Sequence, residues 1–264
     1  MRRLSHTGIE YAVNPDGSQG YGWTIYRGCL HKQQGVCPVK NCWAEAMSKR
    51  GKWDFRKPEL IPENLLLPLS NKKPARILVN FMGDLFGDWV DPEKPIGQTV
   101  ETGNALTRQG WRICADVPLR RAIFTVAHIC PQHTFIFLTK APQNLSKWGK
   151  FPDNCWVGAS VTDQPTLTMA CDHLGSLKAK HKWLSIEPLL KSLLASSYIW
   201  QELYLGSISW VVIGAQSNPE IQPENEWVDE ITAACEMLKI PVFFKDNMKY
   251  QGGRLSWKQF PEDR

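Results

Sequence analysis

The sequence predicts an α/β fold in one domain spanning residues 1–264, a partial or complete (β/α) barrel of about six to eight parallel strands. The 264 residues are 43% hydrophobic, and α/β barrels commonly reach this length as one domain. Short runs rich in β-branched and aromatic residues alternate with amphipathic segments. The runs are apolar almost throughout, which is typical of parallel strands covered on both faces.

Seven runs are expected to form strands, and four segments between them are expected to form helices. The expected strands are 22–26, 76–81, 134–139, 155–161, 182–186, 210–213 and 242–244. The expected helices are 42–50, the segment opened by Asp116-Val-Pro118 and stopped at Cys130-Pro131, 164–174 and 227–238. This number of strand–helix repeats favours a barrel over a short doubly wound sheet.

A segment at about 92–115 interrupts the alternation and is interpreted as an insertion. It contains Arg108, Trp111 and Arg112, which can pair phosphate charge with base stacking. Two interpretations stay open: a lid or nucleic-acid contact, and a plain surface excursion.

The charge balance permits an anionic partner without specifying one. The chain has 31 Lys and Arg against 26 Asp and Glu, a formal net charge of +5, but the basic residues are scattered. A secretory signal and a long apolar span are both absent from the sequence. The expectation is therefore a cytoplasmic protein in a reducing compartment, with no membrane contact.

Three of the eight cysteines lie close together, directly after the first expected strand. Cys29, Cys37 and Cys42 form a ligand set without an obvious fourth member, which suits a metal or cluster that keeps one position open. His31 offers the alternative, because it would complete a Cys3His zinc site. The other cysteines are expected to be small buried hydrophobes: Cys114, Cys130, Cys155, Cys171 and Cys235.

Polar residues or glycines follow every expected strand, and in a barrel these ends form the active face. They favour a shared ligand pocket and include Gly83, Asp84, Lys140, Ser160, Glu187, Gly214, Gln216 and Lys245. Simpler roles are expected for Asp163 and Ser217 as helix caps. Glu187 needs a partner if it is buried, and pairing with Lys140 or Lys245 would be a purely structural explanation of all three.

These residues resemble the radical S-adenosylmethionine superfamily and, within it, a group of uncharacterised three-cysteine proteins often found in bacteriophage and prophage genomes. The resemblance covers most of the chain, and its blocks fall in family order. They are Thr7-Gly-Ile-Glu10, Gly28-Cys29 through Cys37, Cys42-Trp43-Ala-Glu45, Val79-Asn80-Phe-Met-Gly-Asp84-Leu-Phe86, Cys130-Pro-Gln-His133-Thr-Phe135, Leu138-Thr-Lys140, Trp156-Val-Gly-Ala-Ser160-Val, Leu184-Ser-Ile-Glu187-Pro188-Leu, Trp210-Val-Val-Ile-Gly214 and Phe243-Phe244-Lys245.

The resemblance implies a 4Fe-4S cluster held by Cys29, Cys37 and Cys42, with S-adenosylmethionine on the fourth iron. A reductant protein supplies one electron, and the 5'-deoxyadenosyl radical that results abstracts hydrogen from a substrate. Gly83 and Asp84 match the position that binds the methionine amino group.

The resemblance also implies roles for residues at the later strand ends. Ser160 matches a ribose contact, and Glu187, Gly214 and Gln216 look like further cofactor or substrate contacts. Candidate catalytic residues are Glu187, Lys140 and Lys245, and the two lysines would bind an anionic substrate. The phage setting suggests a nucleic acid or nucleotide as that substrate.

Two departures distinguish the chain from that superfamily. The cysteine spacing is longer than the usual C-x3-C-x2-C, and Gln216 stands where the phage group has a glutamate in Gly-Gly-Glu-Ser. The alternative function is a non-catalytic protein whose three cysteines and His31 hold structural zinc and which presents a basic surface to nucleic acid.

Overall fold

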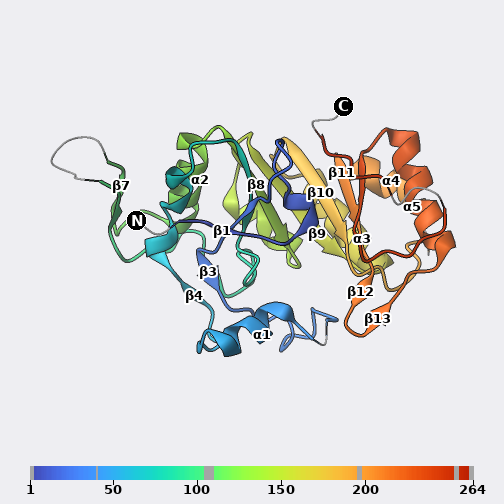
Figure 1. Cartoon of the computed structure of the whole chain (residues 1–264), viewed down its shortest axis with the longest axis horizontal. Coiled ribbons are helices and arrows are strands. Elements are labelled where there is room, and N and C mark those ends of the chain that lie inside the picture. Colours follow the sequence, from blue (N-terminus) through green and yellow to red (C-terminus); the bar gives the residue numbers. More distant parts are fainter. Residues whose placement is uncertain (1–2, 40, 104–109, 195–197, 253–255, 262–264) are drawn as a thin grey trace. The chain divides into compact units, whose positions relative to one another are not determined.

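The computed structural model describes residues 3–39, 41–103, 110–194, 198–252 and 256–261. The predicted mixed α/β class is confirmed, because eight strands form a large, mostly parallel sheet. The chain folds as two compact units, residues 1–137 and 138–264, which run from blue to green and from green to red in Figure 1. Within the described ranges, every helix is too short or too polar to cross a membrane.

The first unit is built on a parallel ladder that one short antiparallel strand extends. β2 pairs with β5 and β5 with β8, all in parallel, whereas β1 pairs antiparallel with β2. These strands are β1 (Ser5–His6), β2 (Tyr21–Trp23), β5 (Ala75–Val79) and β8 (His133–Thr139). The remaining elements are η1 (Glu10–Ala12), β3 (Tyr26–Arg27), α1 (Trp43–Arg50), β4 (Glu59–Leu60), η2 (Pro62–Asn64), η3 (Leu67–Ser70), β6 (Val100–Glu101), β7 (Arg112–Ile113) and α2 (Leu119–Ile129).

The expected first strand, 22–26, is wrong as one element, because the chain leaves the sheet after Trp23. The side chain of Asn80 causes this change of direction. The Asn80 N–H donates to the Trp23 carbonyl over 2.9 Å, which continues the β2–β5 ladder, but its Oδ1 accepts the Tyr26 N–H over 2.6 Å. The chain therefore continues as β3, which pairs with β4 in a separate sheet.

The described part of the expected insertion contains a β-ladder. Val100 lies opposite Ile113 and Glu101 opposite Arg112 in the antiparallel pair β6–β7. Trp111 is exposed at its edge. Arg108 lies outside the described residues.

The second unit is a parallel sheet of four strands in the order β9, β10, β11, β14. Three of the expected strands are confirmed residue for residue, in β9 (Cys155–Val161), β11 (Trp210–Ile213) and β14 (Val242–Phe244), and the fourth is β10 (His181–Ile186). Helices α3, α4 and α5 pack in succession. The other elements are η5 (Pro142–Trp148), α3 (Gln164–Gly175), α4 (Ile199–Leu205), β12 (Gln216–Ser217), β13 (Glu220–Ile221) and α5 (Asn225–Leu238).

The register of this sheet aligns the carboxyl ends of its strands. Ile186 of β10 lies opposite both Val161 of β9 and Ile213 of β11, and Ile213 lies opposite Phe244 of β14. The residue that follows each strand therefore emerges at the same edge. This alignment positions the polar cluster of the second unit.

A group of buried indole rings holds the second unit together. Trp210 is 0% exposed, and its ring centroid lies 5.1 Å from that of Trp183 and 5.4 Å from that of Trp156. Its Nε1 donates to the Gln259 carbonyl over 2.9 Å, so the one polar atom of the ring is satisfied. Large rings that are fully buried contribute much of the hydrophobic free energy of a core.

We expect Trp210→Ala to lower the free energy of unfolding by about 3–5 kcal/mol, because it removes a fully buried ring and leaves a cavity. The measurement is urea denaturation followed by circular dichroism. Tyr204→Ala is the matched control, since this aromatic side chain of the same unit is 69% exposed and should change stability by less than about 0.5 kcal/mol. Equal effects of the two changes would contradict the assignment of the indole group as the core.

Candidate functional site

The cysteine loop begins where two backbone segments of the first unit touch. Gly28 forms an isolated parallel bridge with Gly83, and its N–H donates to the Met82 carbonyl over 3.2 Å. A Cβ on Gly83 would collide with the Gly28 carbonyl oxygen. A side chain at position 83 would therefore prevent this close contact. Cys29 directly follows Gly28, and Asp84 directly follows Gly83.

All three cysteines of the loop are free thiols and partly exposed. The Cys29 N–H donates to the Phe55 carbonyl over 3.0 Å, and the Cys37 N–H donates to the His31 carbonyl over 3.2 Å. Cys42 is the residue that precedes α1. The predicted α1 helix therefore fixes the last cysteine, while backbone hydrogen bonds fix the first two.

The pKa of the Cys29 thiol reflects its burial and the negative charges that act on it. The pKa of the Cys29 thiol is raised to about 12, chiefly by burial, and the negative charges of Asp84, Cys37 and Cys42 contribute to this rise. A hydrogen bond from the His31 backbone N–H to the Cys29 sulfur acts in the opposite direction. Because Asp84, Cys37 and Cys42 are negative when ionised, they make ionisation of Cys29 unfavourable, and a bound cation would reverse this effect.

His31 and Asp84 form a buried pair beside these thiols. Their exposed fractions are 3% and 5%, and His31 Nε2 lies 2.7 Å from Asp84 Oδ2. The other oxygen, Oδ1, accepts the Phe86 N–H over 2.9 Å. His31 Nδ1 is buried, and no hydrogen-bond partner for it exists among the described residues.

The loop contains donor atoms of the types that bind a thiophilic metal or an iron–sulfur cluster, but among the described residues the structure does not bring them together as a metal site. Three free thiols and one buried imidazole nitrogen are ligand types of zinc and iron–sulfur sites. In the part of the chain that the structure describes, no group of three or more His, Cys, Asp or Glu is arranged to hold a metal ion.

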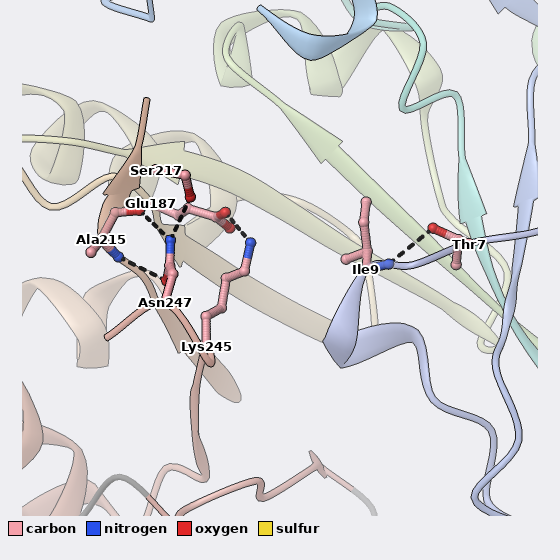
Figure 2. Close-up of polar contacts among 7 residues, drawn as sticks. All are labelled: Thr7, Ile9, Glu187, Ala215, Ser217, Lys245 and Asn247. Carbon is pink, nitrogen blue, oxygen red and sulfur yellow. Dashed lines mark hydrogen bonds and ion pairs between the residues drawn. The ribbon is translucent and has the colours of Figure 1, made fainter. Parts of the chain in front are cut away.

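A second polar cluster lies at the aligned strand ends of the second unit. Figure 2 shows Lys245, which follows β14, pointing toward Glu187, which follows β10, and the two side chains form an ion pair. Their side chains are 16% and 25% exposed. A Cβ on Gly214 would lie 3.0 Å from Lys245 Cδ and 3.1 Å from Glu187 Cγ, so this glycine leaves room for the pair. Of the two lysines considered as the Glu187 partner, Lys245 is the one found.

Asn247, which the sequence reasoning missed, fixes the turn that follows β11 (Figure 2). Its Oδ1 accepts the Ala215 N–H over 3.2 Å, and its Nδ2 donates to the Ala215 carbonyl over 2.6 Å. Nδ2 also contacts Ser217 Oγ at 3.0 Å. The available signal was its position two residues after Lys245, at a strand end that the sequence reasoning had already identified.

The other candidates of the second unit lie on other elements. Gln216 donates through Nε2 to the Pro219 carbonyl over 2.9 Å, within the β12–β13 hairpin. Ser160 lies inside β9, opposite Ser185 of β10, rather than beyond the strand end. Lys140 follows β8 and is half-buried.

Two of the simpler expectations are wrong. Ser217 caps no helix, because it belongs to β12 and accepts from Asn247. Cys114 is exposed rather than buried, since it lies in the segment between β7 and α2.

The remaining simple expectations are confirmed. The other four lone cysteines are buried, and Asp163 caps α3 through a capping box with Thr166. In the first unit, Thr7 of the first resemblance block accepts the Ile9 N–H through its hydroxyl over 3.2 Å (Figure 2).

A comparison with protein-family models matches residues 115–259, more than half of the chain, to the family DUF5131, described as a protein of unknown function. The chain belongs to the DUF5131 family. The matched residues include the Glu187–Lys245 cluster, whereas the cysteine loop precedes them. Neither the curated proteins nor the solved structures contain a match.

We expect Cys29 of the metal-free protein to react with iodoacetamide at a rate that rises about tenfold per pH unit from pH 7 to pH 11, because only the thiolate reacts. Its pKa near 12 lies above the ordinary 9.0, so the protonated thiol is favoured in the folded protein. That contribution to stability is lost as the pH rises from about 9 toward 12. Peptide mass spectrometry gives the rate, with the exposed Cys114 as the control. A plateau below pH 10 would contradict the burial of Cys29.

We expect Glu187 and Lys245 to couple by about 1–2 kcal/mol, between the values of exposed and buried ion pairs. The measurement is a double-mutant cycle of Glu187→Gln and Lys245→Gln in urea denaturation. The matched cycle uses Glu220 and Lys249, whose side chains are 53% and 69% exposed, and should give less than about 0.5 kcal/mol. Equal coupling in the two cycles would refute a special role for the partly buried pair.

Proposed function

We propose that the protein is a radical S-adenosylmethionine enzyme whose Cys29, Cys37 and Cys42 hold a 4Fe-4S cluster. The observation that carries this proposal is the group of three free thiols beside Asp84, at the point where the loops after β3 and β5 meet. Three thiolates leave one iron for a further ligand. The cluster, once loaded, would supply one-electron cleavage of S-adenosylmethionine and so a 5'-deoxyadenosyl radical for hydrogen abstraction.

Asp84 would accept a hydrogen bond from the amino group of S-adenosylmethionine. Asp84 Oδ2 lies 2.7 Å from His31 Nε2 and Oδ1 accepts the Phe86 N–H, and an ionised carboxylate can accept several hydrogen bonds at once. Charge-assisted bonds of this kind are among the stronger hydrogen bonds in proteins. Gly83 has no side chain and would therefore leave room for that amino group.

Residues at the strand ends of the second unit have further roles in this proposal. Ser160, Gly214 and Gln216 would contact cofactor or substrate. Lys140, Lys245 and Glu187 are the proposed catalytic groups, in which the lysines attract an anionic substrate such as a nucleotide or nucleic acid. The ion pair of Glu187 with Lys245 favours this role, because an anion that displaces the carboxylate would find a cation already fixed at the strand edge.

The mostly parallel sheet would be the wall of a partial or complete (β/α) barrel in one domain, with the segment at about 92–115 as its insertion. The enzyme would act in the cytoplasm of a bacterial cell, as part of phage nucleic-acid modification or repair, and would receive its electron from a reductant protein.

We expect anaerobically reconstituted and reduced protein to form 5'-deoxyadenosine from S-adenosylmethionine, and Cys37→Ala to reduce the yield at least tenfold, because the cluster loses a ligand. Chromatography of the product and iron analysis give the result. Cys114→Ala is the matched control, since this exposed thiol lies outside the loop. A folded protein that retains zinc and makes no product would refute the proposal and favour the zinc-binding alternative.

A further inference from the structure

The positive charge of the chain is concentrated in one segment of the first unit, residues 27–57. This segment contains eight Lys and Arg and only two acidic residues, Glu45 and Asp54, which gives it a formal charge of +6. The whole chain has a formal charge of +5, so the remaining residues together carry −1. The attraction of an anionic partner is therefore strongest at this segment.

Five cations of the segment are exposed and form no ion pair with the residues that the structure describes. They are Lys49, Arg50, Lys52, Arg56 and Lys57. Basic residues in the last turn of a helix complement the helix dipole, which accounts for the first two at the end of α1. This explanation does not extend to the three cations that follow the helix.

Two backbone turns gather these cations at the end of α1. The Trp53 N–H donates to the Ser48 carbonyl over 3.1 Å, and the Lys57 N–H donates to the Asp54 carbonyl over 3.1 Å. Asp54 Oδ1 also accepts the Arg56 N–H over 3.0 Å. The chain after α1 therefore folds back on itself instead of carrying its charges away from the helix.

Two large apolar side chains of α1 are exposed next to this charge. Trp43 is 54% exposed and Met47 is 42% exposed, and because they are four positions apart, they lie on the same face of the helix. Arg50 Nη1 lies 3.8 Å from Met47 Sδ, so a cation borders the apolar pair. Exposed aromatic rings beside cations are typical of proteins that bind single-stranded nucleic acids, in which the rings stack on bases and the cations contact phosphates.

The residue types favour a nucleic acid over an acidic protein as the partner. Three of the five unpaired cations are lysines, and lysine is depleted in protein–protein interfaces. Phosphate contacts, in contrast, use lysine and arginine alike. Stacking on Trp43 requires an unstacked base, which single strands offer and duplexes do not.

We propose that the α1 surface binds a single-stranded nucleic acid, with Trp43 stacking on a base and the cations contacting phosphates. The α1 surface consists of Trp43, Met47, Lys49, Arg50, Lys52, Arg56 and Lys57. The inference goes beyond the proposed function, since it assigns a binding surface that requires neither the cluster nor S-adenosylmethionine.

The experiment measures the fluorescence anisotropy of labelled oligothymidylate and oligouridylate of about 20 nucleotides, bound by the purified full-length protein over a series of salt concentrations. Lys49→Gln, Arg50→Gln and Lys52→Gln in combination should weaken binding about tenfold at ~0.1 M salt and lower the slope of log K against log salt by about 2, because each phosphate contact contributes about 0.7. Trp43→Ala should weaken binding about 5–100-fold without changing the slope, because it removes stacking and no charge.

Matched variants exclude a general effect of charge or of aromatic area. Lys72→Gln, Lys73→Gln and Lys94→Gln in combination remove the same charge from exposed positions of the same unit, and at ~0.1 M salt they should change affinity less than about threefold, because long-range attraction is screened. Trp111→Ala removes an indole that is 48% exposed and should leave affinity unchanged. Circular dichroism checks that each variant is folded.

The outcomes either support the α1 surface or overturn it. Losses confined to its variants support it, and the tighter of the two oligonucleotides then identifies DNA or RNA as the ligand. Equal losses in the two triple variants, or binding of neither oligonucleotide, overturn it. Duplex DNA bound as tightly, with no effect of Trp43→Ala, overturns single-strand binding, and displacement by polyglutamate at equal charge identifies a surface for acidic proteins instead. Formation of 5'-deoxyadenosine is measured separately, so failure of this inference and failure of the proposed function are distinguishable.

Discussion

The candidate site of the first unit depends on the close approach of two glycine backbones. Gly28 and Gly83 touch, and a side chain on Gly83 would prevent this contact. The contact joins the loop that carries the cysteines to the loop that carries Asp84. Without it, the ion-pairing and hydrogen-bonding groups of the two loops would not share one buried environment.

The chain reaches this contact because Asn80 ends the regular sheet. Its backbone continues the ladder with Trp23, while its side chain takes the Tyr26 N–H that a longer strand would have donated elsewhere. A side chain that satisfies a backbone donor offers the chain an alternative to continued pairing. The loop with Cys29 therefore starts close to the sheet edge rather than farther along a straight strand.

Sequence reasoning predicted what depends on local pattern and missed what depends on contacts across the chain. The apolar runs of β9, β11 and β14 and the capping residue Asp163 were correct, because burial periodicity and capping act over a few residues. The break after Trp23 was missed, since it is caused by Asn80, which lies more than fifty positions away. The structural role of Asn247 was missed for the same reason, because its partner Ala215 comes from another strand end.

The two polar clusters differ in how their charge is balanced. Glu187 and Lys245 form an ion pair, so their two charges cancel. In the cysteine loop, the charges of Asp84, Cys37 and Cys42 disfavour ionisation of Cys29, and the buried pair of His31 and Asp84 lies beside it. A cation at this place would favour ionisation of the thiols. The metal group of the proposed function would provide that positive charge.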